Sequence, residues 1–129
     1  MDVGRISSAA LMLSGVAGVV IPEQVGAALD LPATSRRGVA ETRAALGGTY
    51  AALGGWALVS RAPGARVAVG VTWLGAGVAR LGSLVLDRPE ADWTFWAYLA
   101  AEIGLGVAAI GSSVSRSTHV PRNNAAANR

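Results

Sequence analysis

The sequence contains no cysteine and no lysine, and its only histidine is His119, near the C-terminus. Without cysteine the chain has neither disulfides nor thiolate metal sites. A single histidine in a polar tail argues against a Ser-His-Asp triad and against a histidine-based metal site. The glycine pairs are not followed by the Lys-Ser/Thr of a phosphate-binding loop. We therefore predict neither a metal nor a cofactor.

Charged residues are also few, at 15% of the chain, whereas hydrophobic residues make up 52% and the mean hydropathy is +0.43. This balance is typical of a chain whose solvent is mostly lipid. The 11 basic residues are all arginines, and they lie singly or in one pair, mostly at the ends of apolar segments. With a net charge of +3, this pattern indicates membrane topology rather than nucleic-acid binding.

Four apolar segments, 6–21, 39–60, 67–86 and 93–113, alternate with short connections. About 20 helical residues cross the hydrocarbon core of a bilayer. The short connections make consecutive helices antiparallel, which favours an all-α, up-down four-helix bundle embedded in the membrane. The first segment is the shortest, and the alternative is the apolar region of a signal peptide, although no small-x-small cleavage site follows it directly.

A short helix and a tail complete the predicted organisation. Pro22 followed by Glu23 is typical of a helix start. The apolar residues that follow share one face: Val25, Ala28 and Leu29. This pattern predicts a short interfacial helix between the first and second spans. Residues 1–114 would form the transmembrane domain, and residues 115–129 a polar, mobile, cytoplasmic tail.

Arginines are distributed unequally between the two ends of the predicted spans. Six lie on the side of the chain termini: Arg5, Arg61, Arg66, Arg116, Arg122 and Arg129. Three lie on the other side, together with five acidic residues: Arg36, Arg37, Arg88, Glu23, Asp30, Asp87, Glu90 and Asp92. Because arginine-rich loops stay in the cytoplasm, we predict a multi-pass protein of the inner (plasma) membrane with both termini cytoplasmic. Trp93 and Trp96 would lie near the outer interface.

Four charged residues lie inside the apolar segments: Glu41, Arg43, Arg80 and Glu102. At about 1.5 Å of rise per residue, all four fall in the outer half of the membrane. Charges within a span usually face the interior of a bundle, pair with one another and mark a functional site. Two acids and two bases at similar depth therefore indicate one cluster.

Helical phase predicts the surroundings of this cluster. Glu41 shares a face with small residues, against which another backbone can pack closely: Ala45, Gly48, Ala52 and Gly55. Aromatic residues share faces with the other charges: Tyr50 with Arg43, Trp73 with Arg80, and Tyr98 with Glu102. We predict that the four charges converge, that these aromatic residues line the space beside them, and that Asp87 reaches back toward Arg80.

Several motifs carry a resemblance to a known family: Pro22-Glu23 with the short helix after it, Glu41-Thr42-Arg43-Ala44 with Gly47-Gly48, Arg80-Leu81 with Ser83 and Asp87, and Glu102. Through these motifs, residues 5–112 resemble a family of small bacterial integral membrane proteins of unknown function, broadly DoxX-like in build. The resemblance implies a four-span fold and ties the four internal charges together, but it supplies no reaction. Leu46 stands where that family often has an aromatic residue.

The first functional hypothesis is that the protein binds a small amphiphilic molecule, such as a quinone, an isoprenoid or a lipid, and isomerises or cyclises it if it is an enzyme. Arg43 and Arg80 would hold an anionic or carbonyl group. Glu41 or Glu102 would act as hydrogen-bond partner or general acid/base. The remaining residues of the predicted substrate site are Tyr50, Trp73, Tyr98 and Asp87.

The alternative is a non-catalytic structural or accessory subunit of a larger membrane complex, in which two Glu–Arg pairs clamp the helices. A proton or ion pathway is a third and weaker hypothesis, because no acidic residue lies in the inner half of any span. The expected partners are membrane lipids, an amphiphilic ligand, and a second copy or another membrane protein. The sequence leaves open whether the protein is an enzyme.

Overall fold

The computed structural model describes residues 2–62 and 64–117, and every regular element in this part of the chain is helical. The elements are α1 (Val3–Val20), α2 (Pro22–Ala28), α3 (Arg36–Glu41), the π-helix η1 (Thr42–Gly48), α4 (Thr49–Val59), α5 (Gly64–Leu86) and α6 (Trp93–Ser117). Three of them, α1, α5 and α6, are long and apolar enough to cross a membrane. The predicted all-α class is confirmed. Most of the predicted tail, including His119, lies outside the described residues.

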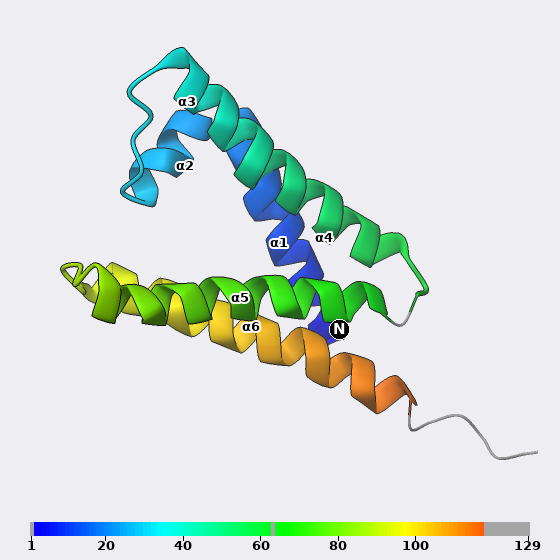
Figure 1. Ribbon diagram of the computed structural model, residues 1–129. Helices are drawn as coiled ribbons and strands as arrows, with labels where there is room; N and C mark the ends of the chain where they lie inside the picture. Colours follow the sequence, from blue (N-terminus) through cyan, green and yellow to red (C-terminus); the bar gives the residue numbers. More distant parts are fainter. Residues whose placement is uncertain (1, 63, 118–129) are drawn as a thin grey trace, which may run out of the picture.

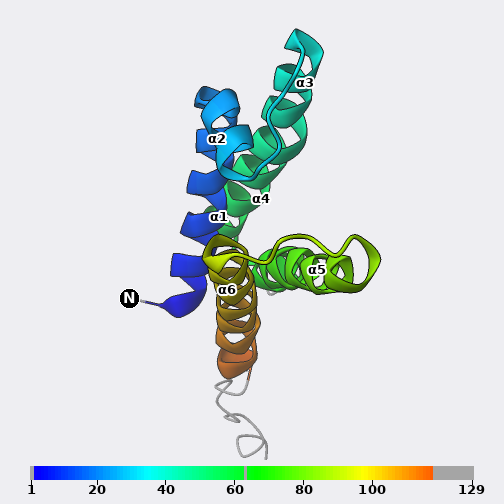
Figure 2. The ribbon, with the colours of Figure 1, turned by 90° about the vertical axis from the view of Figure 1, so that its left-hand side faces the viewer.

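The helices form two antiparallel pairs, one made by α1 with η1 and α4, the other by α5 with α6. The two pairs cross steeply instead of lying side by side (Figure 1, Figure 2). They meet near the N-terminal half of α1 and diverge toward α2 and α3 (Figure 1). Four side-by-side helices, as in an up-down bundle, are therefore not confirmed.

The second predicted span is helical but not uniform. It begins at Arg36, where the Ser35 hydroxyl accepts a hydrogen bond from the Gly38 N–H at 3.1 Å, the usual role of a serine N-cap. The helix then passes through η1 into α4 without a break, because the junction residues Thr42 and Thr49 keep right-handed helical angles. This π-helical stretch divides residues 36–59 into three short elements, none of which reaches spanning length. Single π-helical turns within α-helices occur frequently at functional sites.

Glycines set the distance between α1 and the helix opposite it. The Cα of Gly47 lies against Gly18, because a Cβ on Gly18 would stand 2.9 Å from it. A Cβ on Gly54 would stand 2.7 Å from the Ser8 carbonyl oxygen and would overlap the Met12 backbone. Close backbone contact of this kind replaces the hydrophobic effect as the force that associates helices in lipid.

The glycines used for this contact are not those that helical phase predicted. Gly48 and Gly55 were expected to face another backbone, but a Cβ on either would meet nothing closer than 3.8 Å. The contacting face instead carries their neighbours Gly47 and Gly54. The face that carries Gly48 and Gly55 is therefore turned away from α1.

The two pairs are joined where α1 meets α5 and α6. The Ser7 hydroxyl donates to the Leu105 carbonyl oxygen at 2.8 Å, and Arg66 forms an ion pair with Asp2 at 2.6 Å. The buried core at this junction consists of small and aliphatic residues: Leu11, Ala57, Ala65, Val69 and Ala109. The short helix α2 follows α1 directly, with Pro22 in its first turn as the sequence predicts.

The adjacent glycines Gly54 and Gly55 provide a matched test of the glycine contact. We expect Gly54→Ala to lower the free energy of unfolding by about 1–3 kcal/mol, because the added methyl group overpacks against α1. Gly55→Ala should be neutral or stabilising by up to about 1 kcal/mol, because alanine favours the helix and its methyl group has room. Denaturant unfolding of the purified protein in detergent measures both. Equal effects of the two substitutions would contradict the observed packing.

Candidate functional site

The candidate site is an ion pair between α5 and α6. Arg80 donates through Nε to Oε2 of Glu102 at 3.0 Å and through Nη2 to Oε1 at 2.7 Å. The Glu102 side chain is only 8% exposed and that of Arg80 25%. Two parallel hydrogen bonds fix the plane of the guanidinium group relative to the carboxylate, which a single contact would not do.

Local sequence explains why these two side chains meet. Because α5 and α6 are antiparallel and joined by a short connection, Arg80 near the end of one faces Glu102 near the start of the other. Gly77, one turn before Arg80, is buried against α6, where a Cβ would lie 2.9 Å from Ile103 Cδ1. The missing side chain at Gly77 allows the two helices to approach closely enough for the bidentate contact.

Two aromatic rings flank the guanidinium group. The Arg80 Cζ lies 5.6 Å from the ring centroid of Phe95 and 5.4 Å from that of Tyr98, both within cation–π distance. The Tyr98 hydroxyl donates to the Ala28 carbonyl oxygen at 3.3 Å, which links α6 to the end of α2. The site is therefore an oriented cation with aromatic surface beside it.

The first turn of α6, which carries Phe95, is capped by Asp92. Its carboxylate accepts from the Phe95 N–H at 2.9 Å and from the Thr94 hydroxyl at 2.8 Å. These donors hold the pKa of Asp92 below its ordinary value, because they favour the charged form. The stabilising contribution of the cap is therefore present above the ordinary aspartate pKa and is lost as the pH falls through the lowered value.

The hydrogen bonds to Glu102 leave part of the Arg80 guanidinium group unused. An arginine side chain has five N–H donors, and only two of them are engaged here. The other three have no acceptor among residues 2–62 and 64–117. In hydrocarbon such donors require a partner, since no water is present to accept from them. This part of the group can bind a carbonyl, carboxylate or phosphate oxygen.

Glu41 and Arg43 do not join Arg80 and Glu102, so the prediction of one buried four-charge cluster is wrong. The Glu41 side chain is 67% exposed and lies 3.7 Å from Arg37, one turn away on the same helix. The Arg43 side chain is exposed and has no hydrogen bond or ion pair within the described parts of the chain. The reasons are the steep crossing of the two helix pairs and the π-helix η1, which changes the phase of α3 relative to α4.

The remaining predicted residues are divided between the core and the surface. The Tyr50 ring of α4 lies against the Trp73 ring of α5, with 6.4 Å between the ring centroids. Trp73 stands seven residues before Arg80, or roughly 10 Å along the helix, and its buried indole N–H has no acceptor in the described structure. Asp87 is exposed just beyond the end of α5, and no ion pair in the described structure joins it to Arg80.

Two contacts were not among those predicted from the sequence: that of Phe95 with Arg80, and the Arg37–Glu41 ion pair. Phe95 lies two helical turns before Glu102, and this spacing on one face was the available signal. The Arg37–Glu41 pair has the i, i+4 spacing that stabilises exposed helices, and it explains Glu41 without a buried site.

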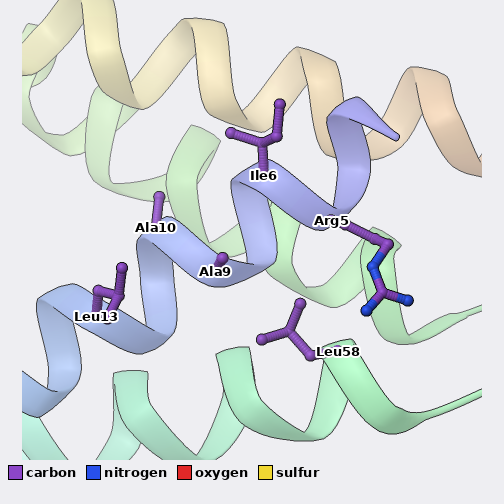
Figure 3. Close-up of a pocket in the computed structure, with 6 residues that line it drawn as sticks. All are labelled: Arg5, Ile6, Ala9, Ala10, Leu13 and Leu58. Atoms are coloured by element: carbon purple, nitrogen blue, oxygen red, sulfur yellow. The ribbon is translucent and has the colours of Figure 1, made fainter. Parts of the chain in front are cut away.

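A separate hollow lies on the surface of the α1/α4 pair (Figure 3). It has a volume of about 410 Å³ and is lined by Arg5, Ile6, Ala9, Ala10, Leu13 and Leu58. None of these residues belongs to the Arg80–Glu102 pair. Because its lining holds a single polar side chain, it cannot orient a reacting group as the ion pair can, and we keep the ion pair as the candidate functional site.

Comparison with known proteins adds no assignment. No protein-family model matches the sequence, and neither a curated protein nor a solved structure matches it. The resemblance to DoxX-like proteins stays a prediction, and the interpretation of the site depends on its geometry.

The ion pair should be required as a unit for stability. We expect Glu102→Leu to lower the free energy of unfolding by about 2–4 kcal/mol, because it leaves the guanidinium group of the half-buried Arg80 side chain without its ion-pair partner. The double variant Arg80→Met/Glu102→Leu should recover most of this loss, since an apolar pair of similar volume needs no desolvation of charge. Glu41→Leu, at an exposed pair, should change stability by no more than about 0.5 kcal/mol. Thermal unfolding in detergent measures the set, and additive losses in the double variant would contradict the assignment.

Proposed function

We propose that the protein is a membrane-embedded binding protein for a small amphiphilic molecule of the quinone, isoprenoid or lipid class. Arg80 holds an anionic or carbonyl oxygen of the ligand through donors that Glu102 leaves free. The apolar body of the ligand lies against Phe95 and Tyr98. The observation that carries this proposal is the Arg80 side chain, which is 25% exposed. Its guanidinium group is fixed in plane by Glu102 and still has three donors without an acceptor in the described structure.

Energetics support a role for this ion pair beyond holding two helices together. A buried ion pair is frequently no more stabilising than apolar residues of the same volume, because desolvation offsets the attraction between the charges. Gly77 already brings α5 and α6 into close contact beside it. A clamp at this point therefore needs no charges, whereas recognition of a polar head group does.

Binding is better supported than chemistry. Both carboxylate oxygens of Glu102 accept hydrogen bonds from Arg80, so proton transfer by Glu102 requires one of these bonds to open first. Polarisation of a ligand carbonyl by Arg80 needs no such rearrangement. We accordingly assign Arg80 to ligand binding and Glu102 to orienting Arg80. Any isomerisation or cyclisation would be a later step, in which Glu102 exchanges a proton with the ligand. Glu41 has no part in this proposal.

Native mass spectrometry of the detergent-extracted protein tests the proposal. The unmodified chain should retain a small molecule, and Arg80→Met/Glu102→Leu should fold but lose it, because the apolar pair offers no donors. The matched control Arg37→Met/Glu41→Leu removes an exposed ion pair and should keep the ligand. An unmodified protein without ligand, or a double variant that retains it, would contradict the proposal.

The proposed membrane arrangement has four spans, with the continuous helix formed by α3, η1 and α4 as the fourth. Membrane helices are usually tilted by less than about 40° from the bilayer normal, so two steeply crossed pairs must align more closely for all four to span. In the bilayer the pairs would then approach an up-down bundle, with α2 at the interface. Both chain termini would lie in the cytoplasm of a cell with this protein in its inner membrane.

The absence of cysteine allows a direct test of this topology. Ala62→Cys lies in the α4–α5 turn, and Ala91→Cys lies in the α5–α6 turn, so four spans place them on opposite sides. We expect a membrane-impermeant maleimide added to intact cells or spheroplasts to label Ala91→Cys and to leave Ala62→Cys unlabelled. Labelling of both turns, or of Ala62→Cys alone, would overturn the proposed orientation.

One observation favours the alternative of an accessory subunit. Arg43 is exposed in η1, within the proposed fourth span, and the described residues provide no acid for it. A carboxylate from another membrane protein would neutralise it. In that case mild extraction should yield a heteromeric complex that Arg43→Gln disrupts, while a homogeneous monomer would reject this alternative.

A further inference from the structure

The hollow on the α1/α4 pair has the construction of a lipid site. It is lined by two small residues, Ala9 and Ala10, and by the larger apolar side chains of Ile6, Leu13 and Leu58 (Figure 3). Leu13 is 60% exposed and Ile6 41%, so the walls are open to the surroundings of the helix. Small residues flanked by larger apolar ones form a groove that fits a flexible hydrocarbon chain.

Charge lies at one end of this groove. The Arg5 side chain extends beyond the groove on the side away from Leu13 (Figure 3). It is exposed and has no hydrogen bond or ion pair among the described residues. Arg61 is exposed just beyond the end of α4, and the neighbouring acid Asp2 is engaged by Arg66 at 2.6 Å. The end of the groove is therefore cationic.

The length of the groove matches one leaflet of a bilayer. Arg5 and Leu13 are eight residues apart on α1, or roughly 12 Å along its axis. Half of a typical hydrocarbon core is about 15 Å thick. The groove therefore runs from the arginine near the end of α1 to about the middle of the hydrocarbon core of the bilayer. This length matches a single acyl chain below its head group.

We infer that this groove binds an anionic phospholipid, with one acyl chain between Ile6 and Leu13 and the phosphate at Arg5. This site is independent of the Arg80–Glu102 pair and would select lipid from the leaflet at the α4–α5 end of the protein. Arg5 gives the preference for a negatively charged head group, and the small side chains of Ala9 and Ala10 leave space for the chain.

Lipid retention by the full chain tests this inference. Native mass spectrometry on protein titrated with phosphatidylglycerol or phosphatidylcholine should show one retained lipid with a preference for phosphatidylglycerol. Arg5→Gln should reduce that preference by about fivefold, the effect of one arginine at an anionic membrane surface. Ala10→Leu should weaken retention of both lipids because it fills the groove. Arg36→Gln, an exposed arginine at the opposite end of the α1/α4 pair, is the matched control and should change neither.

Two results would overturn the inference. The first is equal retention of the two lipids by the unmodified protein, or a preference that Arg5→Gln leaves intact. The second is a dimer that excludes lipid and that Ala10→Leu abolishes, because the groove would then be covered by a second copy of the chain. Neither result would affect the ligand test at Arg80, since that test uses variants of a different helix pair.

Discussion

A polar group in hydrocarbon must find its partner within the protein or in a bound molecule, and this constraint connects the principal features of the structure. Helices satisfy their own backbones, which accounts for the all-helical fold of residues 2–62 and 64–117. Glu102 is satisfied by Arg80, with both of its oxygens engaged. Arg80 is satisfied only in part, because three of its five donors have no acceptor in the described structure.

Glycine contacts determine where these polar groups can meet. In lipid, helices gain little from burying apolar surface against one another, so close backbone approach is the principal means of association. Gly47 and Gly54 bring α4 and η1 onto α1, and Gly77 brings α5 onto α6. The second of these contacts lies beside the ion pair, whereas the first has no charged contact of this kind beside it in the described structure.

The sequence predicted local features well and long-range features poorly. The bounds of α5 and α6 follow from apolar runs and from the Pro-Gly and acidic turns between them. The Arg80–Glu102 contact follows in turn, because a short connection fixes how two adjacent helices face each other. Glu41 and Arg43 depend instead on how one helix pair crosses the other, and apolar periodicity does not encode that angle. The π-helix was also not predictable, since neither composition nor the apolar pattern of residues 42–48 marks it.

The central claim is that the free donors of Arg80 bind an oxygen of a molecule that is not part of this chain. A high-resolution structure of the protein purified with its native lipids tests it most directly. We predict density for a non-protein oxygen about 3 Å from a guanidinium nitrogen of Arg80 that does not contact Glu102, continuing into an apolar body beside Tyr98 and Phe95. A guanidinium group whose donors are all taken by protein acceptors or by bulk water would contradict the claim and would make the ion pair a structural contact.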